Sequence, residues 1–246
     1  MNIKEYKNFI CGANILLPTP FKKNLNIDFK SLENNVKYLI DNGVKKGNSI
    51  LKPTSSDGEY ALLSTEEQKE VIQCVVEASK NIVPVVPGTF HTDFKRTIEI
   101  TKFAERTGAS AVMLMPPPYY YENIYKINKE KHIVNYFKSI GKEINIGIMI
   151  YNQPRRNGIE ITVDIYKRIL KEVPNFLSVQ DCQVDKNKTI NIVRELSDHL
   201  SVNGCGAGEE FAPAYLLFGL DGFITTIGNF SPSFTVKIFK LFLFIP

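Results

Sequence analysis

The sequence lacks tryptophan, has few cysteines and histidines, and contains no apolar run long enough to cross a bilayer. A membrane-spanning helix needs roughly 20 consecutive apolar residues, so we expect no membrane contact. The chain begins Met1-Asn2-Ile3-Lys4-Glu5, without the apolar core of a signal peptide. This start predicts a cytoplasmic protein.

The sequence also has few residues that could form disulfides or bind a metal. The four cysteines contain no CxxC pair and are too few for a disulfide scaffold, so a reducing cytoplasm is the default. The three histidines lie far apart and show neither HxH nor HExxH spacing, which argues against a zinc site. The sequence therefore predicts neither a metal nor another cofactor.

Charge is nearly balanced, with 30 basic and 26 acidic residues and a net charge of +4. The basic residues are spread along the chain and alternate with acids. A nucleic-acid groove would need a basic stripe with interleaved aromatic side chains. We therefore expect no nucleic-acid partner.

Short apolar runs recur along the chain and alternate with amphipathic stretches. Most of these runs are apolar at nearly every position, which is typical of parallel strands covered on both faces. The predicted strands are 14–17, 49–52, 83–86, 111–115, 146–151, 176–180, 200–203 and 222–226.

The stretches between these runs have helical periodicity. Leu32, Val36 and Leu39 form one apolar stripe, and Ser64 with Glu67 forms a capping box before a helix that ends near residue 79. A third helix is expected to follow Asp93 and to end at Gly108. Further helices are expected at 126–140, 163–173, 188–198, 210–218 and 232–243.

Eight strands and eight helices in 246 residues predict a (β/α)8 TIM barrel. We expect one domain over residues 1–246, with its last helix at about 232–243. A doubly wound open sheet is the alternative. It would need a glycine-rich phosphate turn after the first strand, where the chain instead reads Pro18-Thr19-Pro20-Phe21.

In a barrel, the chemistry lies where strands end and the following loops begin. Read in order, these segments resemble the dihydrodipicolinate synthase / N-acetylneuraminate lyase family over nearly the whole chain. The Tyr-Asn-x-Pro-x-Arg-x-Gly block at 151–158 is the most specific segment. The others are Pro-Thr-Pro-Phe at 18–21, Ser-Asp-Gly-Glu at 56–59, Val-Pro-Val-Val-Pro-Gly-Thr at 83–89, Pro-Tyr-Tyr at 118–120, and Gly-Phe-Ile at 222–224 with Asn229 and Pro232.

The resemblance implies Schiff-base chemistry on a 2-oxo acid, in which a lysine on the sixth strand attacks the ketone. By position, Tyr151 relays protons, assisted by Ser56 and by Tyr120 from a neighbouring subunit. A homo-oligomer, either a dimer or a tetramer, is therefore implied. Arg156 is placed to hold a second carboxylate, for which a guanidinium fork is suited.

Two positions depart from the family. Gln180 stands at the position of the Schiff-base lysine, and an amide cannot form an iminium. Asp57 replaces the usual Thr or Ser before Gly58, where it would repel the carboxylate of the 2-oxo acid. We expect Asp57, Gly58, Arg156 and Gln180 to contact the ligand.

Two functions follow from these departures. One is a lyase that cleaves, condenses or dehydrates a small 2-oxo acid or sugar acid without the usual lysine. The other is a degenerate homologue that binds a ligand or subunit without turnover. Lys52, near the end of the second strand, is either a displaced nucleophile or a structural residue that points outward or pairs with an acid such as Glu59.

The C-terminus is the remaining departure. Members of the family continue for several tens of residues beyond the barrel, and we expect most of that helical segment to be missing here. The apolar end, Leu241-Phe242-Leu243-Phe244-Ile245-Pro246, is either packed against the barrel or a partner, or the result of a truncated reading frame.

Overall fold

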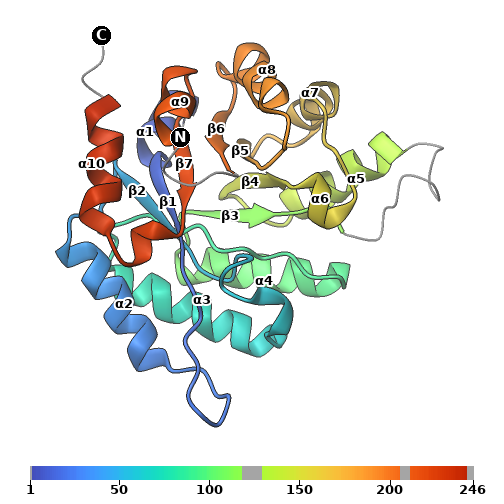
Figure 1. Cartoon of the computed structure of the whole chain (residues 1–246). Helices are drawn as coiled ribbons and strands as arrows, with labels where there is room; N and C mark the ends of the chain where they lie inside the picture. The colour runs from blue at the N-terminus through green and yellow to red at the C-terminus, as the bar shows by residue number, and fades with distance from the viewer. Residues whose placement is uncertain (1, 118–128, 206–210, 243–246) are drawn as a thin grey trace.

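The computed structural model describes residues 2–117, 129–205 and 211–242 (Figure 1). Its centre is a curled, parallel, seven-stranded sheet in the order β2-β1-β7-β6-β5-β4-β3. The strands are β1 Gly12–Leu16, β2 Ser49–Lys52, β3 Ala111–Leu114, β4 Gly147–Asn152, β5 Phe176–Asp181, β6 Ser201–Gly204 and β7 Gly222–Thr225.

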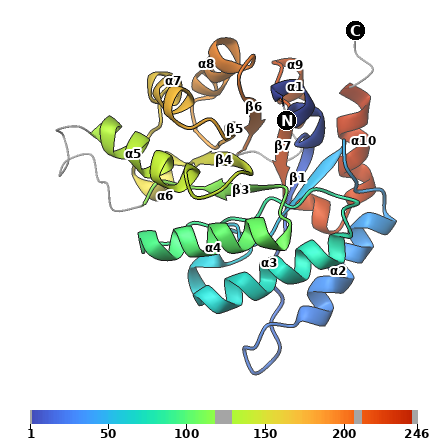
Figure 2. The same cartoon turned by 180° about the vertical axis from the view of Figure 1, so that it is seen from behind.

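Helices cover the outside of this sheet. Figures 1 and 2 show α2, α3 and α4 on one side and α7 and α8 on the other. The helices are α1 Ile3–Phe9, α2 Phe29–Asp41, α3 Thr65–Ser79, α4 Phe94–Thr107, α5 Lys129–Gly141, α6 Pro154–Asn157, α7 Val163–Glu172, α8 Lys186–Leu196, α9 Ala212–Leu217 and α10 Pro232–Phe242. In the described residues, no helix has the length and apolar character needed to cross a membrane.

Local signals located several helix ends correctly. The capping box before α3 is confirmed, because Ser64 Oγ accepts from the amide of Glu67 while the Glu67 carboxylate accepts from the amide of Ser64. Asp93 caps α4, and Gly108 ends it in the left-handed conformation that glycine tolerates.

The predicted strand at 83–86 does not form a continuous ladder, and that expectation is wrong. Single bridges join this segment to its neighbours, Leu51 to Val85 and Gly88 to Met113. Pro84 and Pro87 have no amide hydrogen to donate, although their carbonyls accept hydrogen bonds from Leu51 and Met113. The segment therefore lies between β2 and β3 as an irregular connection.

Side chains alternate between the two faces of the sheet. Val112 and Leu114 of β3 belong to the cluster that packs against the helices, whereas Met113 belongs to a second cluster with Ile50 and Met149. This second cluster fills the inner face, because residues two apart on a strand point to the same side. Two residues beyond Ile50, Lys52 therefore also points inward.

Helix α1, which we did not predict, packs against the amino-terminal part of the strands. The Tyr6 hydroxyl lies 2.9 Å from Ser178 Oγ. A Cβ atom on Gly147, the first residue of β4, would lie 2.8 Å from the Tyr6 ring, so the close approach requires glycine there. Because Tyr6 is buried against this end, a ligand must approach from the carboxyl ends of the strands.

Candidate active site at the carboxyl ends of the strands

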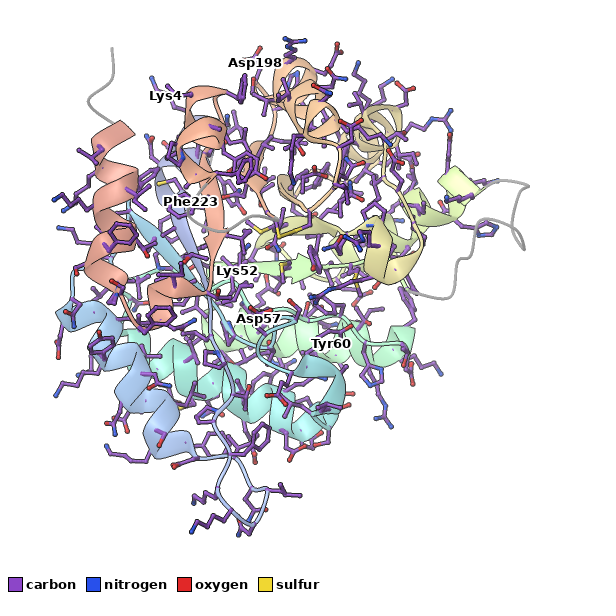
Figure 3. The ribbon with its side chains drawn as sticks, in the orientation of Figure 1. Lys4, Lys52, Asp57, Tyr60, Asp198 and Phe223 are labelled. Atoms are coloured by element: carbon purple, nitrogen blue, oxygen red, sulfur yellow. A yellow bond between two sulfur atoms is a disulfide. The ribbon has the colours of Figure 1, made fainter. Side chains whose placement is uncertain are left out.

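Lys52 is the most unusual residue of the interior. Its side chain is fully buried, and Nζ donates hydrogen bonds to Gln180 Oε1 at 2.5 Å and to Met149 Sδ at 3.0 Å. Three strands separate β2 from β5 in the sheet order, so the Lys52–Gln180 contact crosses the space that the curled sheet encloses. Figure 3 shows Lys52 near the centre of the molecule.

The contacts of Lys52 decide between the alternatives left open by the sequence. The side chain points inward and meets an amide rather than Glu59 or another acid, and none of the ion pairs among the described residues includes it. Burial lowers the pKa of Lys52 well below its usual value, because a low-dielectric surrounding disfavours the charged amine. The structure thus holds an uncompensated lysine opposite Gln180.

Tyr151 lies at the carboxyl end of β4, directly opposite Gln180 in the register with β5. Burial raises the pKa of Tyr151, while the charge of Arg156 and a hydrogen bond with Ser56 lower it. Ser56 Oγ in turn donates to Asp57 Oδ1 at 3.0 Å. Tyr151, Ser56 and Asp57 therefore form a continuous chain from the interior to the loop after β2.

Two aromatic residues border this chain. The rings of Tyr60 and Phe90 meet edge to face at a centroid distance of 4.3 Å, and Phe90 lies 6.3 Å from the ring of Tyr151. Burial raises the pKa of Tyr60, the Tyr151 phenol raises it further, and the Arg156 charge lowers it. Sequence reasoning missed Tyr60, although its place directly after the Ser-Asp-Gly-Glu motif was an available signal.

The loop after β2 is held in a strained conformation. Thr54 has a φ of 49°, a value that β-branched residues rarely adopt. Its hydroxyl donates to the carbonyl of Gly88 at 2.8 Å, and Thr19 Oγ1 donates to the carbonyl of Gly58 at 2.7 Å. A Cβ on Gly58 would lie 2.9 Å from the Leu17 carbonyl oxygen, so glycine permits the close approach. These contacts fix the positions of Ser56 and Asp57.

Comparison with known proteins agrees with this arrangement. A sequence model of the dihydrodipicolinate synthetase family matches residues 11–243. The chain belongs to this family. It is 30% identical over 225 residues to 4-hydroxy-tetrahydrodipicolinate synthase of Methanothrix thermoacetophila, covering 92% of this chain and 72% of the relative. The same enzyme of Oceanobacillus iheyensis is 33% identical over 215 residues, with 86% and 68% covered.

Solved structures of the family share the fold. The chloride-inhibited dihydrodipicolinate synthase of Acinetobacter baumannii, complexed with pyruvate, superimposes with a TM-score of 0.83 at 26% identity, covering 95% of this chain and 76% of that one. The dihydrodipicolinate synthase of Aquifex aeolicus gives a TM-score of 0.84 at 24% identity, with 95% and 75% covered. The curled parallel sheet described above is thus the fold of the dihydrodipicolinate synthetase family.

Within this family fold, the structure brings together most residues that the sequence singled out. Tyr151, Ser56 and Asp57 form the chain described above, and the charge of Arg156 on α6 acts on Tyr151. Gln180 lies in the interior against Lys52, and Gly58 shapes the loop that carries Asp57. Tyr120 falls outside the described residues.

A buried polar cluster next to this site was not predicted. Asp181, which follows Gln180, accepts hydrogen bonds from Asn152 Nδ2 at 2.8 Å, Gln183 Nε2 at 3.1 Å and Thr189 Oγ1 at 2.5 Å. Burial raises the pKa of Asp181, and these three hydrogen bonds oppose the rise. The cluster ties the carboxyl ends of β4 and β5 to α8 and so holds Gln180 in place.

The cysteines also differ from expectation. Cys182 and Cys205, in the loops after β5 and β6, form a disulfide, whereas Cys11 and Cys74 are free. No cysteine spacing indicated this pair. It forms because the amide of Cys205 donates to the carbonyl of Asp181 at 2.9 Å, which brings the two loops together.

Proposed function

We propose that this chain is a lyase that acts on a small 2-oxo acid or sugar acid, by aldol cleavage or condensation or by dehydration. The chain from Tyr151 through Ser56 to Asp57 is the observation that carries the proposal. The relatives named 4-hydroxy-tetrahydrodipicolinate synthase, at about 30% identity, support the same class of chemistry.

The residues divide the work by position. The Tyr151 phenol, nearly excluded from water, gives a proton to an oxygen that develops negative charge and takes it back later. Ser56 passes the proton between Tyr151 and the Asp57 carboxylate. Arg156, exposed on α6, binds a carboxylate of the substrate through its planar fork. Gly58 shapes the loop that presents Asp57 to the ligand, because the missing Cβ lets this loop approach the Leu17 carbonyl.

The proposal includes the architecture that the resemblance implies. The chain forms one barrel domain of the (β/α)8 type over residues 1–246, in which the irregular segment 83–88 takes the place of one strand and Gln180 occupies the family's lysine position. It assembles in the cytoplasm as a dimer or tetramer, and the resemblance assigns Tyr120, which lies outside the described residues, to the site of the neighbouring subunit. Light scattering tests the assembly, and a monomer at working concentration would remove Tyr120 from the site.

A degenerate homologue that binds without turnover is the second candidate. The engagement of the Gln180 amide by Lys52 favours it, because that amide oxygen is already occupied. Asp57 adds a negative charge where a 2-oxo acid would place its carboxylate. Both features disfavour the binding of a 2-oxo acid next to Gln180.

The test is turnover of a panel of 2-oxo acids and sugar acids by the full chain and two variants. We expect Tyr151→Phe to lower kcat by about 10²- to 10⁴-fold, as removal of a general acid–base group does. Tyr38→Phe is the matched control, since its hydroxyl is exposed on α2 and donates to the Phe230 carbonyl. Undiminished turnover in Tyr151→Phe would contradict the assigned role. Binding without turnover of any compound would establish the second candidate.

A further inference from the structure

We propose that Lys52 is the nucleophile of this site, and that its Nζ adds to the carbonyl carbon of the substrate to form an imine inside the curled sheet. The inference rests on the proposed function for its substrate class. It adds a covalent step and a residue on β2 that the proposed function does not use. The observations behind it are the burial of Lys52, its two contacts, and the position of its partner Gln180 opposite Tyr151 in the sheet register.

The contacts of Nζ fit a neutral amine. A neutral amine has two N–H groups and one lone pair, whereas an ammonium has three N–H groups. Within the described residues, Nζ has two acceptors, Gln180 Oε1 and Met149 Sδ. Two acceptors use both N–H groups of the amine and leave its lone pair free, and they would leave one N–H of an ammonium unsatisfied. The lowered pKa of Lys52 agrees with the neutral form.

The neighbours of Lys52 supply the proton transfers that imine formation needs. Met149, which touches Nζ, and Tyr151 are two residues apart on β4 and belong to the same inner cluster. Tyr151 is the one nearer the carboxyl end of the strand. Gln180, the other partner of Nζ, lies opposite Tyr151 in the β4–β5 register, so we place the Tyr151 phenol and the Lys52 amine at the same carbonyl compound.

The step is a condensation that releases water. The Nζ lone pair forms a bond to the carbonyl carbon, the π electrons move to the oxygen, and this oxygen takes a proton from the Tyr151 phenol. Loss of a proton from nitrogen, back to the Tyr151 and Ser56 chain, gives a neutral carbinolamine. The Tyr151 phenol, protonated again by that transfer, then gives its proton to the hydroxyl group, and water leaves as the nitrogen lone pair forms the C=N bond; a protonated imine remains on Lys52 and a phenolate on Tyr151.

Stability alone does not account for this lysine. Lysines are almost never fully buried unless they are paired, and the partner here is an amide, not a carboxylate. Methionine has nearly the same length and would fill the space without a polar nitrogen to desolvate. A buried amine with a perturbed pKa, whose partner Gln180 lies opposite Tyr151 in the sheet register, is the arrangement expected of a reacting group.

Reductive trapping tests the proposal on the unaltered full chain. The protein is incubated with pyruvate, or with the uncharged ketone hydroxyacetone, and reduced with borohydride, and the modified peptide is then mapped by mass spectrometry. We expect the reduced adduct on Lys52. The uncharged probe avoids repulsion by Asp57. No adduct on Lys52 with either probe, or adducts confined to exposed lysines such as Lys37, would overturn the proposal.

An exchange of the two contacting residues provides the matched control. Lys52→Gln is expected to abolish the adduct, and the double variant Lys52→Gln, Gln180→Lys is expected to restore it on position 180, because the two side chains meet at the same point. An undiminished adduct elsewhere in Lys52→Gln would count against Lys52. Where a variant does not fold, the mapping on the unaltered chain decides alone.

Trapping and turnover separate this inference from the proposed function. With Lys52 as nucleophile, Lys52→Gln loses at least ~10³-fold in kcat. Turnover that persists in Lys52→Gln without an adduct would overturn the inference and leave the proposed function standing. An adduct on Lys52 without turnover of any compound would support the inference and overturn the proposed function.

Discussion

Replacing Lys52 with methionine should make the protein more stable at neutral pH, and the gain should shrink as the pH rises. Burial lowers the pKa of Lys52 in the folded protein, whereas in the unfolded chain it returns to about 10.4. Between these two values the unfolded state binds one more proton than the folded state. Linkage then makes the wild-type chain more stable with rising pH, by about 1.4 kcal/mol per pH unit.

Lys52→Met lacks this dependence, so the difference in unfolding free energy between variant and wild type should fall by about 1.4 kcal/mol for each pH unit between the folded and the unfolded pKa of Lys52. Urea unfolding followed by circular dichroism at several pH values measures it. Lys37→Met is the control, because Lys37 is exposed on α2 and in water in both states. A difference that stays constant with pH would show that Lys52 remains protonated when folded, and would refute the reasoning.

Three further predictions concern the frame of the site. A Cβ on Gly88 would lie 2.4 Å from the Thr54 carbonyl oxygen, so Gly88→Ala should lower the unfolding free energy by about 3 kcal/mol. Gly47→Ala, with open space around it but a φ of 83°, should cost only about 1 kcal/mol in the same urea titration. Ser64→Ala should lose about 1 kcal/mol by removing the cap of α3, and an unchanged Tm would contradict the cap. Thiol titration of the denatured, air-equilibrated protein should find two free cysteines before reduction and four after, and four before reduction would mean that the Cys182–Cys205 disulfide is absent.

Local sequence signals were sufficient for most elements. The seven strands lie within two residues of their predicted bounds, because each is a short apolar run between turn residues. The failures have local causes as well. Pro84 and Pro87 interrupt the expected third strand, and α6, with four residues, is too short to show helical periodicity. Helix α1, with seven residues, was missed although Asn2 and Glu5 form a capping box and Ile3, Tyr6 and Ile10 recur at helical spacing.

The site was only partly accessible to sequence reasoning. Tyr151, Ser56 and Asp57 could be named because each lies in a motif at the end of a strand. The contact between Lys52 and Gln180 could not, because it joins residues 128 positions apart and depends on how far the sheet curls. From the sequence alone, the Lys52 side chain could point outward, pair with an acid or enter the site. The structure shows that it points inward and contacts Gln180.

The Lys52–Gln180 contact changes what Gln180 indicates about the chemistry of the site. Taken alone, Gln180 indicates the loss of an amine from the site. In the structure its oxygen accepts a hydrogen bond from Lys52 of β2, so the interior still holds an amine, which comes from another strand. A buried lysine that lowers stability at neutral pH, in a position where methionine would fit, is the trade between stability and activity expected of a functional residue. The pH dependence of Lys52→Met and the trapping experiment examine the two sides of that trade separately, since the first reports the protonation state of the amine and the second its reactivity.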